Sequence, residues 1–219
     1  RQRQMCIRDR ASTDEIYLTV KGKGGHAARP HMNIDPVLIA SHIVVALQQI
    51  VSRYIDPALP SVLSFGRVEA NGITNVIPDE VKLEGTFRTF DEDVRFDTHE
   101  KIKKMAKMLA QSMGGDCEVF INVGYPFLKN DESLTNFARD CAIEYLGAEN
   151  VADMEIRLGA EDFAYFSQQI PSSFYRLGIN NVERGITSGL HTATFDIDEL
   201  ALKTGMGTMA WLAMQTLKR

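Results

Sequence analysis

One part of the chain, residues 15–123, carries hydrophobic patterns in a fixed order, and that order limits the folds it can adopt. An alternating stretch at residues 15–20 is followed by a long helical repeat. Extended stretches at 61–70 and 81–88 come next, and a second helical repeat precedes a last strand at 117–123. Alternation with period two predicts half-buried strands, and a period near 3.6 residues predicts amphipathic helices. The order β-α-β-β-α-β predicts a ferredoxin-like domain, in which an antiparallel sheet of four strands has both helices on one face.

The first helix has clear boundary signals. Asp35 has the side chain of an N-cap residue, and Pro36 suits the first helical position. Pro57 and Pro60 end the segment, because proline removes a backbone donor and cannot continue a helix. These signals support a helix between the first two strands.

The C-terminal part of the chain has a different character. A helix capped by Asp131 or Ser133 and a terminal helix from about Asp198 flank a short strand at 173–179. Two helices with so little strand are too few to close a core, so their apolar faces require a partner. We therefore expect residues 126–219 to be a piece of a larger domain.

Composition narrows the classes of partner. The 219 residues suit one large domain or two small ones, and a net charge of -5 argues against nucleic acid. No uninterrupted apolar run approaches the ~20 residues that span a bilayer, so no membrane partner is expected. Cys6, Cys117 and Cys141 are odd in number and widely spaced, as in a cytoplasmic protein with reduced thiols.

The first ten residues, RQRQMCIRDR, differ in character from the rest of the sequence. They are rich in arginine, lack the apolar core of a signal peptide and show no periodicity. They resemble a spurious translated sequence, and a flexible native arm is the alternative. In either case we expect residues 1–10 to lie outside the fold. Since the chain does not begin with methionine, we also expect it to be an internal piece of a longer protein.

The stretch GKGGHAARPH, from Gly22 to His31, places His26 directly after a glycine pair. Glycine permits backbone angles closed to other residues and lets a ligand approach the main chain. A histidine displayed there can polarise a carbonyl group or hold an oxyanion near neutral pH. A bare Gly-His pair favours an ordinary loop histidine, whereas the longer string favours a functional one.

This string and further motifs in the same order resemble the aminoacylase, carboxypeptidase and hippurate-hydrolase family of dinuclear-metal amidohydrolases, and within it the hippurate and auxin-conjugate branch. The resemblance runs from about residue 12 to the C-terminus. It implies that residues 11–125 are a lid and dimerisation domain, and that 126–219 are the last portion of an α/β catalytic domain. It also implies a homodimer in which His26 serves the active site of the partner subunit.

Two lid residues are candidates for binding substrate. Asn75 follows Gly72 in a turn, so by itself it is an ordinary turn residue, while its carboxamide could bind a carbonyl or carboxylate. Arg88 lies on the polar face of a strand, where it either pairs with an acid such as Glu84 or forks onto a substrate carboxylate. The resemblance implies the binding role for both, and His31 is a candidate to assist His26 there.

The C-terminal part offers two more candidates. A neutral imidazole is a good zinc ligand, although a lone histidine before an acidic stretch is by default a surface residue. Leu190-His191 followed by Phe195-Asp196 resembles the family's last metal-ligand motif, which implies that His191 binds metal. Glu161 lies in a stretch similar to a branch signature, and it either shapes the site, caps a helix or touches the substrate.

The resemblance also implies parts that this sequence does not display. The family binds two divalent metal ions, for which zinc, manganese and cobalt are all reasonable, and a glutamate of an upstream Glu-Glu pair is its general base. No matching segment precedes Ala11. We therefore expect a fragment of a metal-dependent amidohydrolase of N-acyl amino acids (hippurate-like, auxin-conjugate-like or N-acetyl-diaminopimelate-like), inactive alone. The alternative is a non-catalytic ferredoxin-like module that binds small ligands or mediates dimerisation.

Overall fold

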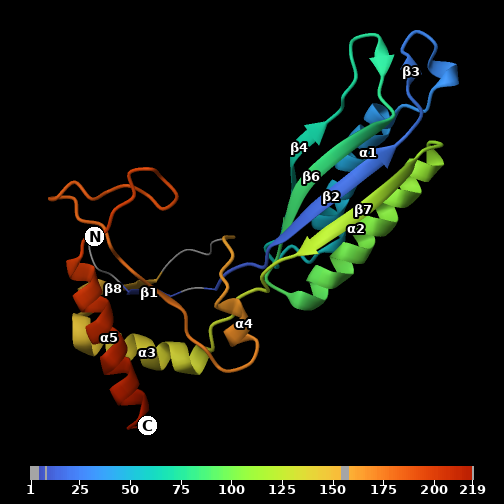
Figure 1. Cartoon of the computed structure of the whole chain (residues 1–219). Helices are drawn as coiled ribbons and strands as arrows, with labels where there is room; N and C mark the ends of the chain where they lie inside the picture. Colours follow the sequence, from blue (N-terminus) through green and yellow to red (C-terminus); the bar gives the residue numbers. More distant parts are fainter. Residues whose placement is uncertain (1–4, 8, 154–157, 219) are drawn as a thin grey trace. The chain divides into compact units, whose positions relative to one another are not determined.

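The computed structural model describes residues 5–7, 9–153 and 158–218, which fall into two compact units. We name Arg10–Leu128 together with Leu158–Asp162 the ferredoxin-like unit, and the remaining described residues the C-terminal unit. Figure 1 follows the chain through both.

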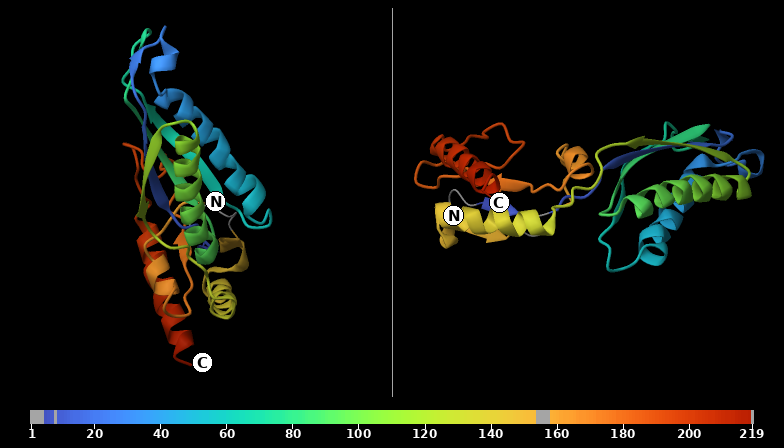
Figure 2. Two further views of the ribbon diagram at one scale, coloured as in Figure 1. Left: turned by 90° about the vertical axis from the view of Figure 1, so that its right-hand side faces the viewer. Right: turned by 90° about the horizontal axis from the view of Figure 1, so that it is seen from below.

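The ferredoxin-like unit is built on a four-stranded sheet in the order β4-β6-β2-β7. Every neighbouring pair in it is antiparallel, and both long helices cover the same face (Figure 1 and Figure 2). The predicted α+β class and ferredoxin-like order are therefore confirmed. The elements are β2 (Asp14–Lys21), β3 (Gly25–His26), the 3-10 helix η1 (Pro30–Met32), α1 (Pro36–Gln49), the π-helix η2 (Ile50–Tyr54), β4 (Val62–Glu69), β5 (Val76–Ile77), β6 (Glu80–Arg88), α2 (Glu92–Ser112) and β7 (Asp116–Val123).

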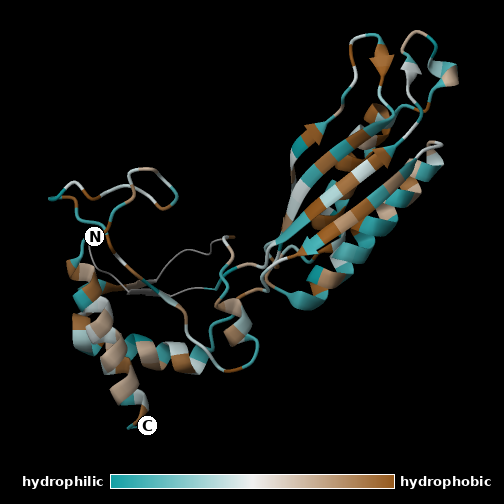
Figure 3. Ribbon diagram, viewed as in Figure 1, coloured by the Kyte–Doolittle hydropathy of each residue, from teal (hydrophilic) through white to brown (hydrophobic). Residues whose placement is uncertain are grey.

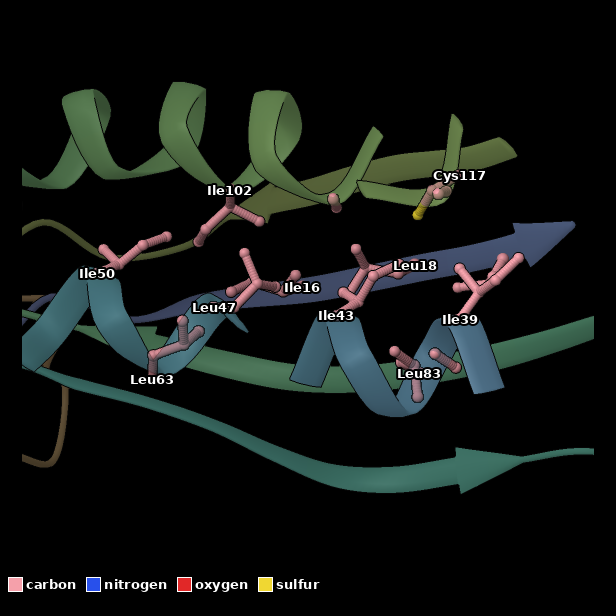
Figure 4. Close-up of a cluster of buried hydrophobic side chains, with 14 of the residues drawn as sticks. Ile16, Leu18, Ile39, Ile43, Leu47, Ile50, Leu63, Leu83, Ile102 and Cys117 are labelled. Carbon is pink, nitrogen blue, oxygen red and sulfur yellow. The ribbon is translucent and has the colours of Figure 1, made fainter. Parts of the chain in front are cut away.

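The core of this unit lies between the sheet and its two helices. Buried and exposed side chains alternate along β2, and the same alternation is visible as bands of hydropathy in Figure 3. Full burial of one such aliphatic side chain stabilises the fold by about 1.5–3 kcal/mol. The packed layer thus gives a rigid support for the loops at both ends of the sheet. Figure 4 shows side chains of this core, among them Ile16, Leu18, Ile39, Ile43, Leu47, Leu83 and Ile102.

Helix α1 begins as predicted. The Asp35 carboxylate accepts hydrogen bonds from the N–H groups of Val37 and Leu38, at 2.8 and 3.2 Å, and Pro36 is the first helical residue. The continuous helix Pro36–Tyr54 has 19 residues and a mean hydropathy of 1.3, which by length and composition is enough to cross a membrane. Polar residues such as Ser41, His42 and Gln48 interrupt its apolar residues, so no uninterrupted apolar run in it approaches ~20 residues, and the expectation of no membrane partner stays a prediction. One face of the helix enters the core, and most of the rest is uncovered in the single chain.

The C-terminal unit combines a small sheet with two long helices. Strand β1 lies in the middle of the order β8-β1-β9, parallel to β8 and antiparallel to β9. Helices α3 and α5 pack through Ala138, Ala142 and Leu212, and the rings of Tyr145 and Trp211 stack at 6.1 Å. The elements are β1 (Met5–Ile7), α3 (Glu132–Leu146), the 3-10 helix η3 (Ala148–Asn150), β8 (Val151–Asp153), α4 (Ala164–Ser167), β9 (Tyr175–Leu177) and α5 (Leu200–Thr216).

The expectation that residues 1–10 lie outside the fold is wrong for two parts of that stretch. Met5–Ile7 forms the central strand just described, and Arg10 is buried and exchanges backbone hydrogen bonds with Leu128. A strand of three residues has no readable periodicity, and its partners come from the far end of the sequence. Residues 1–4 and 8 lie outside the described residues.

Helix α5 leaves much of its apolar surface uncovered within the chain. It buries Ala201 and Thr208, whereas Leu202, Met206 and Met209 are more than half exposed. The spacing of these three residues, i, i+4 and i+7, places them on one face of the helix. Apolar patches of this kind mark contact surfaces in soluble proteins.

Candidate functional site

The turn that carries His26 is joined to the loop that carries Asn75. Strand β3 pairs with β5, with His26 opposite Val76. The N–H of Ala27 donates to the carbonyl of Asn75 at 3.0 Å. Both predicted residues are exposed, and the structure brings them together at the end of the sheet that we name the tip (Figure 1).

The glycines before His26 allow the backbone to pack tightly. A Cβ atom on Gly22 would lie 2.2 Å from the carbonyl oxygen of Ile34. At Gly25, which has φ of +157°, a Cβ atom would lie 2.3 Å from Oδ1 of Asn33. Asn33 in turn donates from Nδ2 to the carbonyl of His26 at 3.1 Å. The turn therefore fixes the backbone of His26, and only glycine fits at these two positions.

The hydrogen bonds of His26 define which ring nitrogen faces outward as a donor. The N–H of Ala28 donates to His26 Nδ1 at 3.1 Å. In a neutral imidazole one nitrogen accepts and the other carries the proton, so this bond places the proton on Nε2. An exposed Nε2–H can donate to an oxygen that gains negative charge. His31 lies on η1 and is exposed as well.

Arg88 lies at the other end of the sheet, which we name the base. It is the last residue of β6 and pairs with Val62, whereas Glu80, the first residue of β6, pairs with Lys21 near the tip. At about 3.3 Å per residue, the two ends of β6 are about 26 Å apart. One chain therefore cannot bring Arg88 and Asn75 onto the same small ligand.

The segment that contains Glu161 lies at the base with Arg88. Nη1 of Arg88 donates to the carbonyl of Leu158 at 3.0 Å, and both side chains are partly buried. Leu158–Asp162 belongs to the ferredoxin-like unit, although its neighbours in sequence belong to the C-terminal unit. The predicted lid residues thus form two groups: His26, His31 and Asn75 at the tip, and Arg88 and Glu161 at the base.

His191 stands in the C-terminal unit on a loop with unusual backbone geometry. Its φ is +65°, and within the described part of the chain it is the sole non-glycine residue with positive φ. This left-handed conformation is costly for an L-residue, and such residues gather at functional sites. The loop is tied by a bond between the hydroxyl groups of Ser188 and Thr194 at 2.9 Å, and it leaves His191 exposed.

Two buried polar residues that were not candidates from the sequence hold the ends of this loop. Asp198 is 0% exposed and accepts from Nδ2 of Asn181 at 2.9 Å and from the N–H of Leu200 at 3.2 Å. Asn181 and Ile186 exchange backbone hydrogen bonds at 2.8 Å. Asp198 was visible in the sequence as a helix start, but its contact with Asn181 depends on the fold.

The donor set of the described residues does not by itself fit a pair of metal ions. Within residues 5–7, 9–153 and 158–218, no three side chains of His, Cys, Asp or Glu are placed to hold one ion. His191 can supply one ligand, and a catalytic zinc site needs three from protein. No catalytic step is derived through a metal from these residues alone.

The described cysteine thiols are not nucleophiles at neutral pH. Burial, together with the charges of Asp116 and Glu118, raises the pKa of Cys117 to about 12. Burial also raises the pKa of Cys141. Because the thiolate is the reactive form, these two residues act as small core side chains.

The fold and the displayed histidines agree with what comparison with known proteins finds. Residues 13–114 match the family M20_dimer, described as a peptidase dimerisation domain. N-acetylcysteine deacetylase of Bacillus subtilis is 36% identical over 208 residues, which cover 95% of this chain and 53% of that protein. Thermostable carboxypeptidase 2 of Saccharolobus solfataricus is 34% identical over 207 residues, covering 94% and 52%.

A solved structure of a related protein has a similar fold. A dinuclear metal-binding peptidase of the M20 family from Bacillus subtilis superimposes with a TM-score of 0.75 at 30% identity, covering 98% of this chain and 53% of that one. The chain therefore belongs to the M20 family. It spans about half the length of the curated relatives it matches.

Proposed function

We propose that the chain is the C-terminal part of a metal-dependent amidohydrolase that cleaves the amide bond of N-acyl amino acids. Its similarity to a deacetylase and a carboxypeptidase supports hydrolysis of an amide with a free carboxylate beside it. The observation that carries the proposal is His26, an exposed residue whose backbone is fixed by a glycine turn and whose Nδ1 accepts from the N–H of Ala28. In this role Nε2–H donates to the oxyanion that forms when water attacks the acyl carbonyl.

The separation of tip and base supports a homodimer in which each site draws on both chains. His26 and Asn75 of one protomer would join Arg88 and Glu161 of its partner. Arg88 would bind the substrate carboxylate, since a guanidinium offers five N–H donors and only Nη1 is directed at Leu158. A twofold arrangement that sets two sheets head to tail brings a tip beside a base.

The uncovered side of the ferredoxin-like unit fits such a dimer. Strand β4 is an edge strand, paired on one side with β6. Helix α1 leaves Leu38 52% and Val45 73% exposed. A sheet edge beside an apolar helix face is a natural pairing surface. We propose β4 and α1 as the contact between the two copies.

We propose His191 as one metal ligand and place the other ligands and the general base in the part of the relatives that this chain does not span. When bound, two divalent ions such as zinc, manganese or cobalt would polarise the acyl carbonyl and activate water. The exposed face of α5, with Leu202, Met206 and Met209, is then the surface that the rest of the catalytic domain covers. On this proposal the 219-residue chain is inactive alone.

The test is to recover the preceding genomic sequence and assay the complete enzyme, with added metal, on a panel of hippurate, auxin conjugates and N-acetyl-diaminopimelate. His26→Ala should lower turnover about ten- to a thousandfold, because one oxyanion donor is lost. Lys104→Ala, on the exposed side of α2 and away from the proposed contact between the two copies, is the control and should retain turnover. Turnover unchanged by His26→Ala would exclude the oxyanion role, and a complete enzyme that hydrolyses nothing on the panel would favour the non-catalytic module.

A further inference from the structure

The start of α2 carries three polar side chains on one face that the proposed function does not use. Glu92, Arg95 and His99 are spaced i, i+3 and i+7, which places them on one side of the helix. Arg95 is 1% exposed and His99 4%, and both contact Asp14, which is 0% exposed. Charged side chains are almost never buried to this extent unless they are paired.

Asp14, the first residue of β2, is the centre of this cluster. Arg95 forms a forked pair with it, from Nε to Oδ2 at 2.9 Å and from Nη2 to Oδ1 at 2.6 Å. His99 Nε2 lies 2.9 Å from Oδ2. The N–H of Gly124, just after β7, donates to Oδ1 at 3.2 Å. The carboxylate thus links α2 to the start of one strand and the end of another.

The same helix face also binds main chain directly. Nη2 of Arg95 donates to the carbonyl of Thr13 at 3.3 Å and to that of Gly124 at 3.0 Å. Glu92 accepts from Arg95 Nη1 through Oε2, at 2.9 Å. Its Oε1 accepts from the N–H of Phe127, also at 2.9 Å. The helix therefore reaches the backbone both before β2 and after β7.

These contacts fall on what we name the connector ribbon, residues 10–13 and 124–128, by which the chain enters and leaves the sheet. Arg10 and Leu128 exchange backbone hydrogen bonds at 3.0 and 2.9 Å, and Thr13 bonds the opposite stretch in both directions at 3.0 Å. A two-stranded ribbon is marginally stable in water by itself. The N–H of Ser12 also donates to the carbonyl of Thr89 at 2.8 Å, and the contacts from α2 add to these bonds.

We propose that Glu92, Arg95 and His99 form an anchor that makes the connector ribbon part of the rigid ferredoxin-like unit. Any movement between the two units then takes place beyond Arg10 and Leu128, and not at the ends of β2 and β7. A buried ion pair is often no more stabilising than apolar side chains of similar volume. The role of the ion pair here is accordingly to hold the ribbon in one orientation through directional hydrogen bonds, which apolar contacts do not provide.

Amide hydrogen exchange of the 219-residue chain, followed by NMR, tests the anchor. The double variant Asp14→Leu with Arg95→Met replaces the ion pair by apolar side chains, so the sheet centre should lose less protection than the ribbon even though His99 loses its contact with Asp14. Protection of the connector ribbon should fall at least about tenfold, while the amides of Leu18 and Leu83 at the sheet centre stay protected. Arg67→Met, which removes an exposed arginine paired with Glu84, is the control. It should leave the amide protection of the connector ribbon and of the sheet centre unchanged.

A second variant keeps the test decisive if the double variant does not fold. Glu92 has 26% of its side chain exposed at the rim of the cluster, so Glu92→Ala should fold. It should speed exchange in residues 124–128 and leave residues 10–13 protected, because the acceptor for the N–H of Phe127 is lost while Arg95 loses its bond to Glu92 but keeps its forked pair with Asp14. Unchanged protection of the ribbon in the folded variants, or an equal loss in the ribbon and at the sheet centre, would overturn the proposal.

Discussion

Replacement of Asp14 by Asn should destabilise the ferredoxin-like unit far more than the loss of one surface charge. The carboxylate accepts two hydrogen bonds from Arg95, one from Gly124, and lies in hydrogen-bond range of His99. Asn offers one acceptor oxygen and turns an NH2 group toward donors, so Arg95 stays charged and buried with Glu92 as its remaining carboxylate partner. Breaking a buried pair by removing one partner costs about 3–5 kcal/mol. We expect a cost in that range for Asp14→Asn.

The stability that Asp14→Asn loses should also depend on pH in a defined direction. Burial alone would raise the pKa of Asp14, but hydrogen bonds from Arg95 and His99 and their charges outweigh it and hold this pKa below its ordinary value of 3.8. A carboxylate with a lowered folded-state pKa contributes stability that is present above the unfolded-state pKa and is lost as pH falls through the folded one. The free energy of unfolding of the wild type should therefore exceed that of Asp14→Asn by a constant amount near neutral pH. This difference should become smaller below about pH 4.

The assay is the free energy of unfolding of this unit, taken from the urea dependence of amide exchange at Leu18 and Leu83. Asp97→Asn is the matched control, because Asp97 pairs with Lys101 on the exposed side of α2 and should cost under about 1 kcal/mol. A finding that Asp14→Asn lowers the free energy of unfolding by no more than the control does would refute the reasoning. So would a difference in this free energy between wild type and Asp14→Asn that does not become smaller in acid.

Two further predictions concern the backbone of the candidate histidines. Gly25→Ala should displace the Asn33 side chain from the carbonyl of His26 and cost about 1–3 kcal/mol in thermal unfolding, and an unchanged melting temperature would contradict the tight turn. His191→Gly should be about 1 kcal/mol more stable than His191→Ala, since glycine removes the cost of the left-handed conformation. Equal stability of these two variants would show that the loop carries no strain at this position.

Much of the ferredoxin-like unit was predictable because its signals are local. The cap at Asp35 and the strand at residues 81–88 come from side-chain chemistry and period, and the structure confirms both within a residue. Strand Met5–Ile7 was not predictable, since three residues carry no period and their partners are remote in sequence. The sequence analysis did not single out Glu92, Arg95 and His99, whose importance depends on the contact of this helix face with Asp14.

The candidate site was predictable in its residues and only partly in its geometry. The motifs mark His26, Asn75, Arg88 and His191 as candidates, and their roles stay predictions. The separation of tip and base was within reach of the sequence, because a predicted strand of eight residues already places its ends about 23–26 Å apart. The positive φ of His191 could not be predicted from the sequence, since loop conformation depends on contacts made elsewhere in the fold.

The central claim is that each site combines the tip of one protomer with the base of its partner. Its most direct test is complementation between two variants of the complete enzyme that each have strongly reduced activity. His26→Ala and Arg88→Ala are purified separately, mixed in equal amounts and allowed to exchange subunits, and the rate of substrate hydrolysis is measured. Half of the dimers should then be mixed, and each mixed dimer has one intact site, so the mixture should regain about a quarter of wild-type activity. A mixture that is no more active than its two components would contradict the account, because it would place His26 and Arg88 of the same protomer in one site.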